Sequence, residues 1–180
     1  MFDPGVPGTH FMQSAFLVDD LDEAARRWID TTGIGPFFTV RHVTLAEYSH
    51  RGEPRADLDF SVAIAQSGGI QVELIQQHND APSAYRDTIT SVDDGFHHFG
   101  IYTADYDKAY RHYMDRGFDA VVDAKFGDAR FSYIDTRPAI GCMIELIEEF
   151  PLQTELFQRV AAGARDWDGK TDPIRPGFPE

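Results

Sequence analysis

The sequence predicts an α+β fold of two tandem βαβββ modules, followed by a C-terminal helix. Two stretches repeat one plan, in which a strand leads into an Asp-capped helix and three further strands follow. Gln13 precedes Asp20 by seven residues in the first copy, and His98 precedes Asp105 by seven residues in the second. Each copy also ends in a short apolar strand with a glutamate near its centre. Repetition of this kind indicates that one structural unit occurs twice in the chain.

The first module is expected over residues 10–77. Asp20 is a good helix N-cap, and Glu23 stands three residues later as in a capping box. Gly33 is suited to end this helix, because glycine readily adopts the left-handed backbone conformation. Runs of aromatic and β-branched residues, or apolar residues that alternate with polar ones, predict the strands. These strands cover residues 11–18, 37–45, 58–65 and 70–75, with a polar loop at 49–55.

The second module is expected over residues 96–150 and repeats the order of the first. Asp105 caps its predicted helix, and Gly117 closes that helix. Its predicted strands cover residues 97–103, 118–126, 130–135 and 141–147, with turns at 127–128 and 137–138. A polar connector at 78–95 has helical potential around 84–89. The outer segments are an irregular lead-in at 1–9 and a C-terminal region at 151–180, with an amphipathic helix at 152–165 and an extended tail.

Composition and charge restrict the classes of function. At 180 residues the chain forms one domain or two small ones. Its net charge of −14 disfavours binding to the phosphate backbone of nucleic acids. No apolar run approaches the roughly 20 residues of a membrane-spanning helix, and the N-terminus lacks the pattern of a signal peptide. The one cysteine, Cys142, lies in an apolar strand and is expected to be buried. We therefore expect a cytoplasmic protein that binds neither membranes nor nucleic acids.

Four polar residues are expected to share one face of the sheet, because alternate residues of a strand point to opposite sides. In the strands that hold them, aliphatic and aromatic neighbours point to the other side, where the helices would pack. If the two modules curl together into a curved mixed sheet, the shared polar face lines a cup-shaped cavity. The four residues are Gln13, Glu73, His98 and Glu145.

This set of side chains predicts a divalent-metal site. A carboxylate that is buried without a partner is costly or becomes protonated, so two carboxylates beside an imidazole are most easily explained by a shared cation. Each residue taken alone is ordinary, because a glutamate or histidine in a strand is usually exposed or satisfied by hydrogen bonds. The matched positions in the two copies favour the metal site. Oxygen donors with one histidine nitrogen suit zinc, nickel, cobalt, manganese or iron(II).

The order and spacing of these segments resemble the vicinal oxygen chelate superfamily, which includes glyoxalase I, methylmalonyl-CoA epimerase, extradiol dioxygenases and bleomycin-resistance proteins. The resemblance covers about residues 10–150 and is carried by the segments 17–24, 72–75, 97–101 and 144–147. The His-His start of one strand and the Ile-Glu-Leu-Ile of another look most like methylmalonyl-CoA epimerases. The set Gln, Glu, His, Glu is instead similar to eukaryotic glyoxalase I. The resemblance implies that Gln13, Glu73, His98 and Glu145 hold a divalent metal at the centre of the cup.

The resemblance also implies a metal-dependent isomerase or lyase that acts on a small molecule. Such an enzyme removes a carbon-bound proton next to a metal-chelated carbonyl, with Glu145 or Glu73 as the general base. Glu145 is slightly preferred, because it lies in the copy that carries the histidine. The substrate would be a small oxo compound, a hemithioacetal or a thioester. A homodimer is expected from the superfamily.

Two alternatives stay open. A non-catalytic binding protein of the bleomycin-resistance type would keep an aromatic cup without metal chemistry. A ring-cleaving dioxygenase would need iron(II), and the set of donors makes this chemistry the weaker alternative. Possible aromatic liners of the cup, which core packing explains equally well, are Phe37, Phe38, Tyr48, Tyr102 and Tyr133.

Several other polar residues are weaker candidates for the site. An arginine in the cup could admit an anionic substrate, but each candidate is expected on the solvated surface. By strand alternation His97 points away from the cup, so a structural role is expected for it. His10 is kept only as a substitute for Gln13 if the first strand bulges. The candidate arginines are Arg41, Arg51, Arg55, Arg130 and Arg137.

Overall fold

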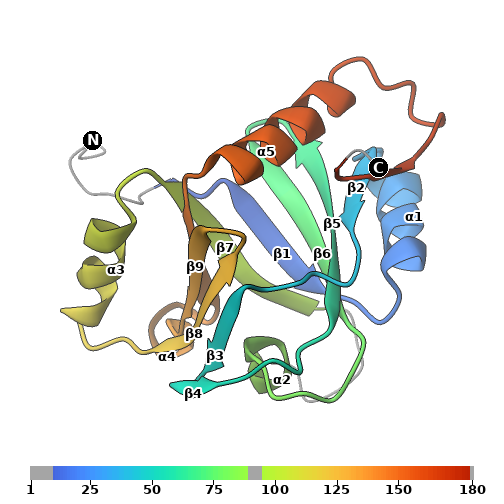
Figure 1. Cartoon of the computed structure of the whole chain (residues 1–180). Helices are drawn as coiled ribbons and strands as arrows, with labels where there is room; N and C mark the ends of the chain where they lie inside the picture. The colour runs from blue at the N-terminus through green and yellow to red at the C-terminus, as the bar shows by residue number, and fades with distance from the viewer. Residues whose placement is uncertain (1–9, 89–94, 179–180) are drawn as a thin grey trace.

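One mixed sheet of eleven strands dominates the computed structural model, which describes residues 10–88 and 95–178 (Figure 1). The strands are β1 (Gln13–Leu17), β2 (Phe37–Val40), β3 (Glu47–His50), β4 (Glu53–Pro54), β5 (Phe60–Ser67), β6 (Ile70–Gln77), β7 (Gly95–Thr103), β8 (Ala120–Phe126), β9 (Ala129–Ile134), β10 (Met143–Glu148) and β11 (Ile174–Pro176). The helices are α1 (Leu21–Thr32), α2 (Ala84–Thr88), α3 (Tyr106–Met114), α4 (Arg137–Ile140) and α5 (Pro151–Ala164). The sheet is curved and open, with the order β11-β2-β5-β6-β1-β7-β10-β9-β8-β3-β4, and it confirms the predicted α+β class.

The first and last strands of the two predicted modules lie side by side in the middle of the sheet. β1 runs parallel to β6, β7 runs parallel to β10, and β1 and β7 pair in antiparallel orientation. The register places Ala15 beside both Glu73 and His98. It also places Gly100 beside both Gln13 and Glu145. Four adjacent strands therefore carry the four predicted site residues.

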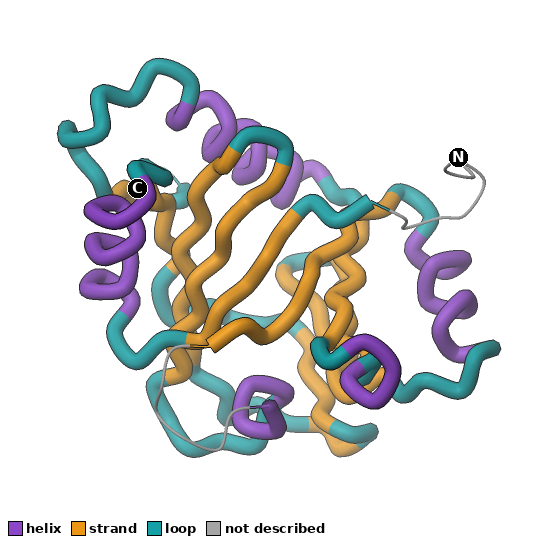
Figure 2. Tube along the Cα trace, turned by 180° about the vertical axis from the view of Figure 1, so that it is seen from behind, coloured by secondary structure: helices purple, strands orange, loops and turns teal. Residues whose placement is uncertain are grey.

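Helices α1 and α3 flank the central strands, as the view from behind shows (Figure 2). Each begins where the sequence predicts, because the Asp20 side chain accepts a hydrogen bond from Glu23 N at 2.8 Å and Asp105 accepts one from Lys108 N at 3.3 Å. Gly33 ends α1 in the left-handed conformation, with a φ of 73°. Within the described part of the chain, no helix has the length and apolar character that crossing a bilayer requires.

The structure divides the strand that was predicted over residues 37–45. β2 ends at Val40, and the chain turns through His42, whose φ of 48° is left-handed. The predicted polar loop at 49–55 is largely a hairpin of β3 and β4. β3 pairs with β8, placing Tyr48 opposite Ala124, so this hairpin extends the sheet beside the second module. The local sequence pattern does not predict the pairing of β3 with β8, because the two strands lie some 75 residues apart in the sequence.

The C-terminal region covers the first half of the sheet. Leu156 and Val160 of α5 pack against Phe38 and Ile64, as the predicted amphipathic pattern requires. The tail, predicted to be extended, adds β11 in parallel beside β2. The short helix α4 replaces the turn predicted at 137–138, and the free Cys142 that follows it is buried as expected, which raises its pKa. The predicted lead-in at 1–9 and the end of the predicted helical stretch at Ile89 lie outside the described residues.

Candidate metal centre

The four residues singled out by the sequence are buried on neighbouring strands. Gln13 of β1 is 1% exposed, Glu73 of β6 is 8%, His98 of β7 is 0% and Glu145 of β10 is 7%. The apolar residues that alternate with them pack on the other side of the sheet. Phe16, Val72 and Leu74 contact the α1 layer, and a matching set on β7 and β10 contacts α3, namely Phe99, Ile101, Ile144 and Leu146. The predicted division into a helix face and a cup face is correct.

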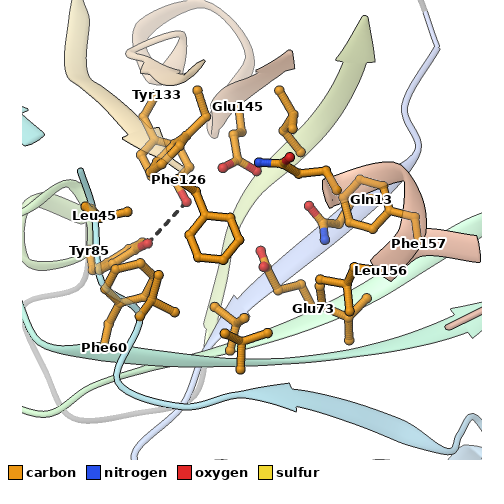
Figure 3. A pocket seen from close by; sticks show the side chains of 17 residues that line it. Gln13, Leu45, Phe60, Glu73, Tyr85, Phe126, Tyr133, Glu145, Leu156 and Phe157 are labelled. Atoms are coloured by element: carbon orange, nitrogen blue, oxygen red, sulfur yellow. Dashed lines mark hydrogen bonds between the residues drawn. The ribbon is translucent and has the colours of Figure 1, made fainter. Parts of the chain in front are cut away.

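Three of the four side chains converge closely. His98 Nε2 lies 3.1 Å from Glu145 Oε2 and 3.6 Å from Glu73 Oε2, and one donor atom from each residue falls within 4.8 Å of the other two. Gln13 lines the same cavity as the two glutamates, and Figure 3 shows all three beside one open space. Among the residues that the structure describes, the buried atoms Gln13 Oε1, Glu73 Oε2 and His98 Nε2 have no hydrogen-bond partner. Unpaired buried donors and acceptors of this kind fit a divalent cation that they would share.

Two buried carboxylates make the centre electrostatically demanding. Burial, and then the charge of Glu145, raise the pKa of Glu73 well above its ordinary value. Burial also raises the pKa of Tyr85 and of Tyr133, whose hydroxyl groups lie 3.2 Å apart at one side of the cavity (Figure 3). Both tyrosines therefore stay protonated and can donate hydrogen bonds. A bound cation would remove the repulsion that the metal-free arrangement carries between Glu73 and Glu145.

His97 does not point away from the cup, so that prediction is wrong. The pairing of β1 with β7 shifts between Ala15 and Phe16, which lie opposite His98 and Phe96, and this leaves His97 as an extra residue. Such a β-bulge turns two successive side chains to the same side. The His97 ring accordingly lies 5.4 Å from the Tyr133 ring, and the His98 ring lies 5.0 Å from it.

His97 fixes the tautomer of His98 through two hydrogen bonds. Its Nε2 lies 3.2 Å from Ala84 O, and its Nδ1 lies 2.9 Å from His98 Nδ1. A carbonyl oxygen only accepts, so His97 Nε2 carries the proton in the first bond. Burial, and then the neighbouring His98, lower the pKa of His97 to about 3, so the ring is neutral and its Nδ1 accepts. His98 therefore donates from Nδ1, which leaves a lone pair on Nε2 directed at the two glutamates.

Most of the remaining lining of the cavity is apolar. Of the five predicted aromatic liners only Tyr133 lines it. Phe37 packs under α1 and Phe38 packs against α5. Tyr48 belongs to the same core cluster as Tyr85 and Tyr133 but does not line the cavity, and Tyr102 bonds to Thr154. Strand parity alone could not decide between these positions and the cup. The apolar lining residues are Val40, Val43, Leu45, Phe60, Val62, Ile64, Phe126, Phe131, Ile147, Leu156 and Phe157.

None of the candidate arginines, nor His10, lines this cavity. Each arginine is paired with a carboxylate, as the partners of Arg41 (Asp22), Arg51 (Asp87), Arg55 (Asp57), Arg130 (Glu148) and Arg137 (Asp135) show. Arg41 and Arg51 are exposed as expected, whereas Arg55, Arg130 and Arg137 are partly buried.

The sequence analysis missed two polar residues of the cavity. Tyr85 lies on α2 within the connector, where no pattern indicates a site. Gln153 lies on α5 and is buried, although the prediction treated this helix only as a packing element. The burial of Gln153 could have been predicted from the sequence, because Gln153 falls at helical spacing with Leu156 and Val160 on the buried face of α5.

Comparison with known proteins identifies the family. Residues 12–133 match the model of the Glyoxalase/Bleomycin resistance protein/Dioxygenase superfamily. The chain belongs to this superfamily, which confirms the resemblance found in the sequence. No curated protein matches the chain by sequence.

Similar solved structures share the fold at low sequence identity. Methylmalonyl-CoA epimerase from Mycobacterium tuberculosis has a TM-score of 0.56 at 19% identity, covering 86% of this chain and 96% of that one. A Streptomyces coelicolor methylmalonyl-CoA epimerase in complex with 2-nitronate-propionyl-CoA has a TM-score of 0.53 at 18% identity, covering 78% and 97%. A hypothetical protein from Bacillus halodurans C-125 has a TM-score of 0.53 at 14% identity, covering 78% and 94%. At these identities the similarity establishes the fold but not the activity, which has to be inferred from the residues of the site.

Proposed function

We propose that this protein is a metal-dependent isomerase or lyase that moves a carbon-bound proton next to a carbonyl group. The observation that carries the proposal is the convergence of Glu73, His98 and Glu145 in a buried cup, where Glu73 Oε2 and His98 Nε2 have no hydrogen-bond partner among the described residues. Membership of the superfamily supports the same class of chemistry. A small-molecule substrate is part of the proposal, and a homodimer and a cytoplasmic location stay predictions.

Gln13, Glu73, His98 and Glu145 would hold the cation, which as a Lewis acid polarises a substrate carbonyl and makes the neighbouring C–H bond more acidic. Zinc, nickel, cobalt, manganese and iron(II) suit these donors. The bonded pair of His97 and His98 keeps the imidazole oriented. Apolar walls exclude water, and this strengthens every charge interaction within the cup.

Glu145 is proposed as the general base. Its carboxylate would take the proton from carbon, and the electrons of the C–H bond would move onto the substrate carbonyl. Glu73, on the other parallel strand pair, could return a proton to the same or to a neighbouring carbon. The burial of Glu73 supports this role, because a carboxyl group removed from water holds its proton more readily.

The test replaces each glutamate by glutamine and follows deuterium uptake at the substrate carbon in deuterated solvent. We expect Glu145→Gln to retain metal, measured by elemental analysis, and to lose most exchange. General-base catalysis contributes about 100-fold to 10,000-fold in rate. Unchanged exchange in Glu145→Gln together with its loss in Glu73→Gln would reassign the base to Glu73. Unchanged exchange in both variants would contradict proton transfer by these carboxylates.

A binding protein without catalysis is the second candidate, and the apolar lining of the cup favours it. Aromatic rings such as Phe60, Phe126 and Phe157 can hold a hydrophobic ligand by contact alone. Elemental analysis after metal-replete growth separates the two candidates, because only the enzyme requires a stoichiometric transition metal. The dioxygenase is supported less, since both ring nitrogens of His97 are bonded and, among the described residues at the centre of the cup, only His98 offers an unpaired imidazole nitrogen.

A further inference from the structure

Gln153 brings an unpaired polar group into the lining of the cup. It lies on α5, it is 7% exposed, and its Oε1 has no hydrogen-bond partner. Leu156 and Phe157 of the same helix form a wall of the pocket and face Tyr85 and Phe60 across it (Figure 3). Leaving an amide unpaired inside a protein costs about 1 to 3 kcal/mol. This amide is therefore expected to have a partner that is absent from the chain itself.

The charges around the cup argue against an anionic partner. Among its described lining residues the ionisable carboxyl groups are Glu73 and Glu145, and none is a lysine or an arginine. A divalent cation held by both carboxylates has its two positive charges balanced by their two negative ones. A further anion enclosed there would lack compensation, and burying an unpaired charge is strongly unfavourable.

Arg130 and Arg137 of the second module are not free to supply the positive charge that an anionic ligand would need. Arg130 bonds to Glu148 at 2.6 Å and to Asp107 at 2.7 Å, and Arg137 bonds to Asp135 at 2.6 Å. Each would have to leave a carboxylate partner before it could bind a ligand. The cup therefore selects by hydrophobic contact and by neutral hydrogen bonds.

We infer that the cup binds an uncharged, largely apolar substrate that directs adjacent oxygens to the metal centre and a separate hydroxyl group to Gln153. A hydroxyl group suits either orientation of the amide, because it can donate to Oε1 and accept from Nε2. The metal end of this inference rests on the proposed function. The apolar contacts and the contact with Gln153 rest on the lining of the cavity alone. Substrates whose charged groups must enter the cup are thereby disfavoured.

The experiment uses three probes with the same reactive end. They are a phenyl-substituted vicinal dione and its para-hydroxyl and para-carboxylate derivatives, titrated calorimetrically into the zinc-loaded full chain. We expect the hydroxyl group to strengthen binding about threefold to tenfold, as one additional neutral hydrogen bond does. We expect the carboxylate to weaken binding by at least about tenfold relative to the unsubstituted dione, because it enters without a cation.

Two variants on one helix locate the effect. Gln153→Met preserves the length of the side chain and should lose the advantage of the hydroxyl probe over the unsubstituted dione. Gln158→Met is the matched control, because Gln158 is exposed on the same helix and should change neither value. Circular dichroism of each variant verifies that it is folded.

The charge argument and the role of Gln153 are contradicted by different results. A carboxylate probe that binds as tightly as the parent dione would overturn the charge argument. A Gln153→Met variant that keeps the hydroxyl advantage would overturn the role of Gln153. Failure of both the parent and the hydroxyl probe to bind would overturn the substrate class itself. Binding as expected without deuterium exchange would contradict only the proposed catalysis.

Discussion

Replacing His97 by phenylalanine tests whether this histidine orients the metal ligand beside it. Phenylalanine keeps a ring of similar size, and the contacts with the Tyr85 and Tyr133 rings at 5.3 and 5.4 Å can persist. It removes both hydrogen bonds of His97. Ala84 O still accepts from the Thr88 hydroxyl at 2.9 Å, so the main loss falls on His98 Nδ1.

The expected magnitude follows from that one lost bond. Leaving the buried His98 Nδ1 without a partner should lower the free energy of unfolding by about 1 to 3 kcal/mol. His98 also becomes free to carry its proton on Nε2 and donate it to Glu145 at 3.1 Å, which competes with metal binding. Loss of such a partner of a ligating histidine typically weakens metal affinity 10-fold to 100-fold.

Zinc affinity, measured by competition with a chromophoric chelator at fixed pH, is the appropriate assay. His97→Gln supplies a side-chain oxygen that can accept from His98, and we expect it to recover part of the affinity. His112→Phe, on the surface of α3, serves as the control. Zinc affinity of His97→Phe within about threefold of the unmodified protein would refute the orienting role, since that role predicts a larger loss.

Three further predictions follow from other parts of the site and fold. The raised pKa of Glu73 means that the metal-free native state holds a proton that the unfolded chain releases near pH 4.5, so the free energy of unfolding should fall as pH rises above this value. Urea unfolding across a pH series should show this fall, and Glu73→Gln should make it smaller. An unchanged pH dependence in Glu73→Gln would contradict the assignment. A Cβ at Gly100 would lie 2.9 Å from Gln13 Oε1 and 3.0 Å from its Cβ, so Gly100→Ala should displace Gln13 and weaken zinc binding, whereas Gly69→Ala, with no atom within 4 Å, should not. Asp20→Ala removes the cap of α1 and should cost about 1 kcal/mol in thermal unfolding without changing zinc affinity, and an effect on zinc would argue against the separation of cap and site.

The sequence was sufficient for features that depend on local chemistry or on alternation. The caps of α1 and α3 follow from Asp20 and Asp105, because capping depends on residues only three positions apart. The convergence of the glutamates follows from period-two alternation in strands whose other face is aliphatic. Family membership follows from the order in which these patterns occur.

Features that depend on distant partners could not be predicted. The bulge at His97 arises from the pairing of β7 with β1, and one extra residue reverses the parity on which the prediction relied. β3 leaves the first module because β8 offers it a free edge, a contact between segments far apart in sequence. The place of Gln153 in the cup depends on how α5 crosses the sheet, which its amphipathic pattern does not determine.

The two margins of the sheet have a consequence for self-association. β4 is two residues long and ends in Pro54, and β11 is three residues long and ends in Pro176. Proline has no amide proton, and short proline-bearing borders are poor templates for a further strand. These borders therefore disfavour the joining of two sheets end to end into a continuous ribbon. A twofold assembly of this chain, if it forms, would have to meet through helices, loops or the open side of the curved sheet.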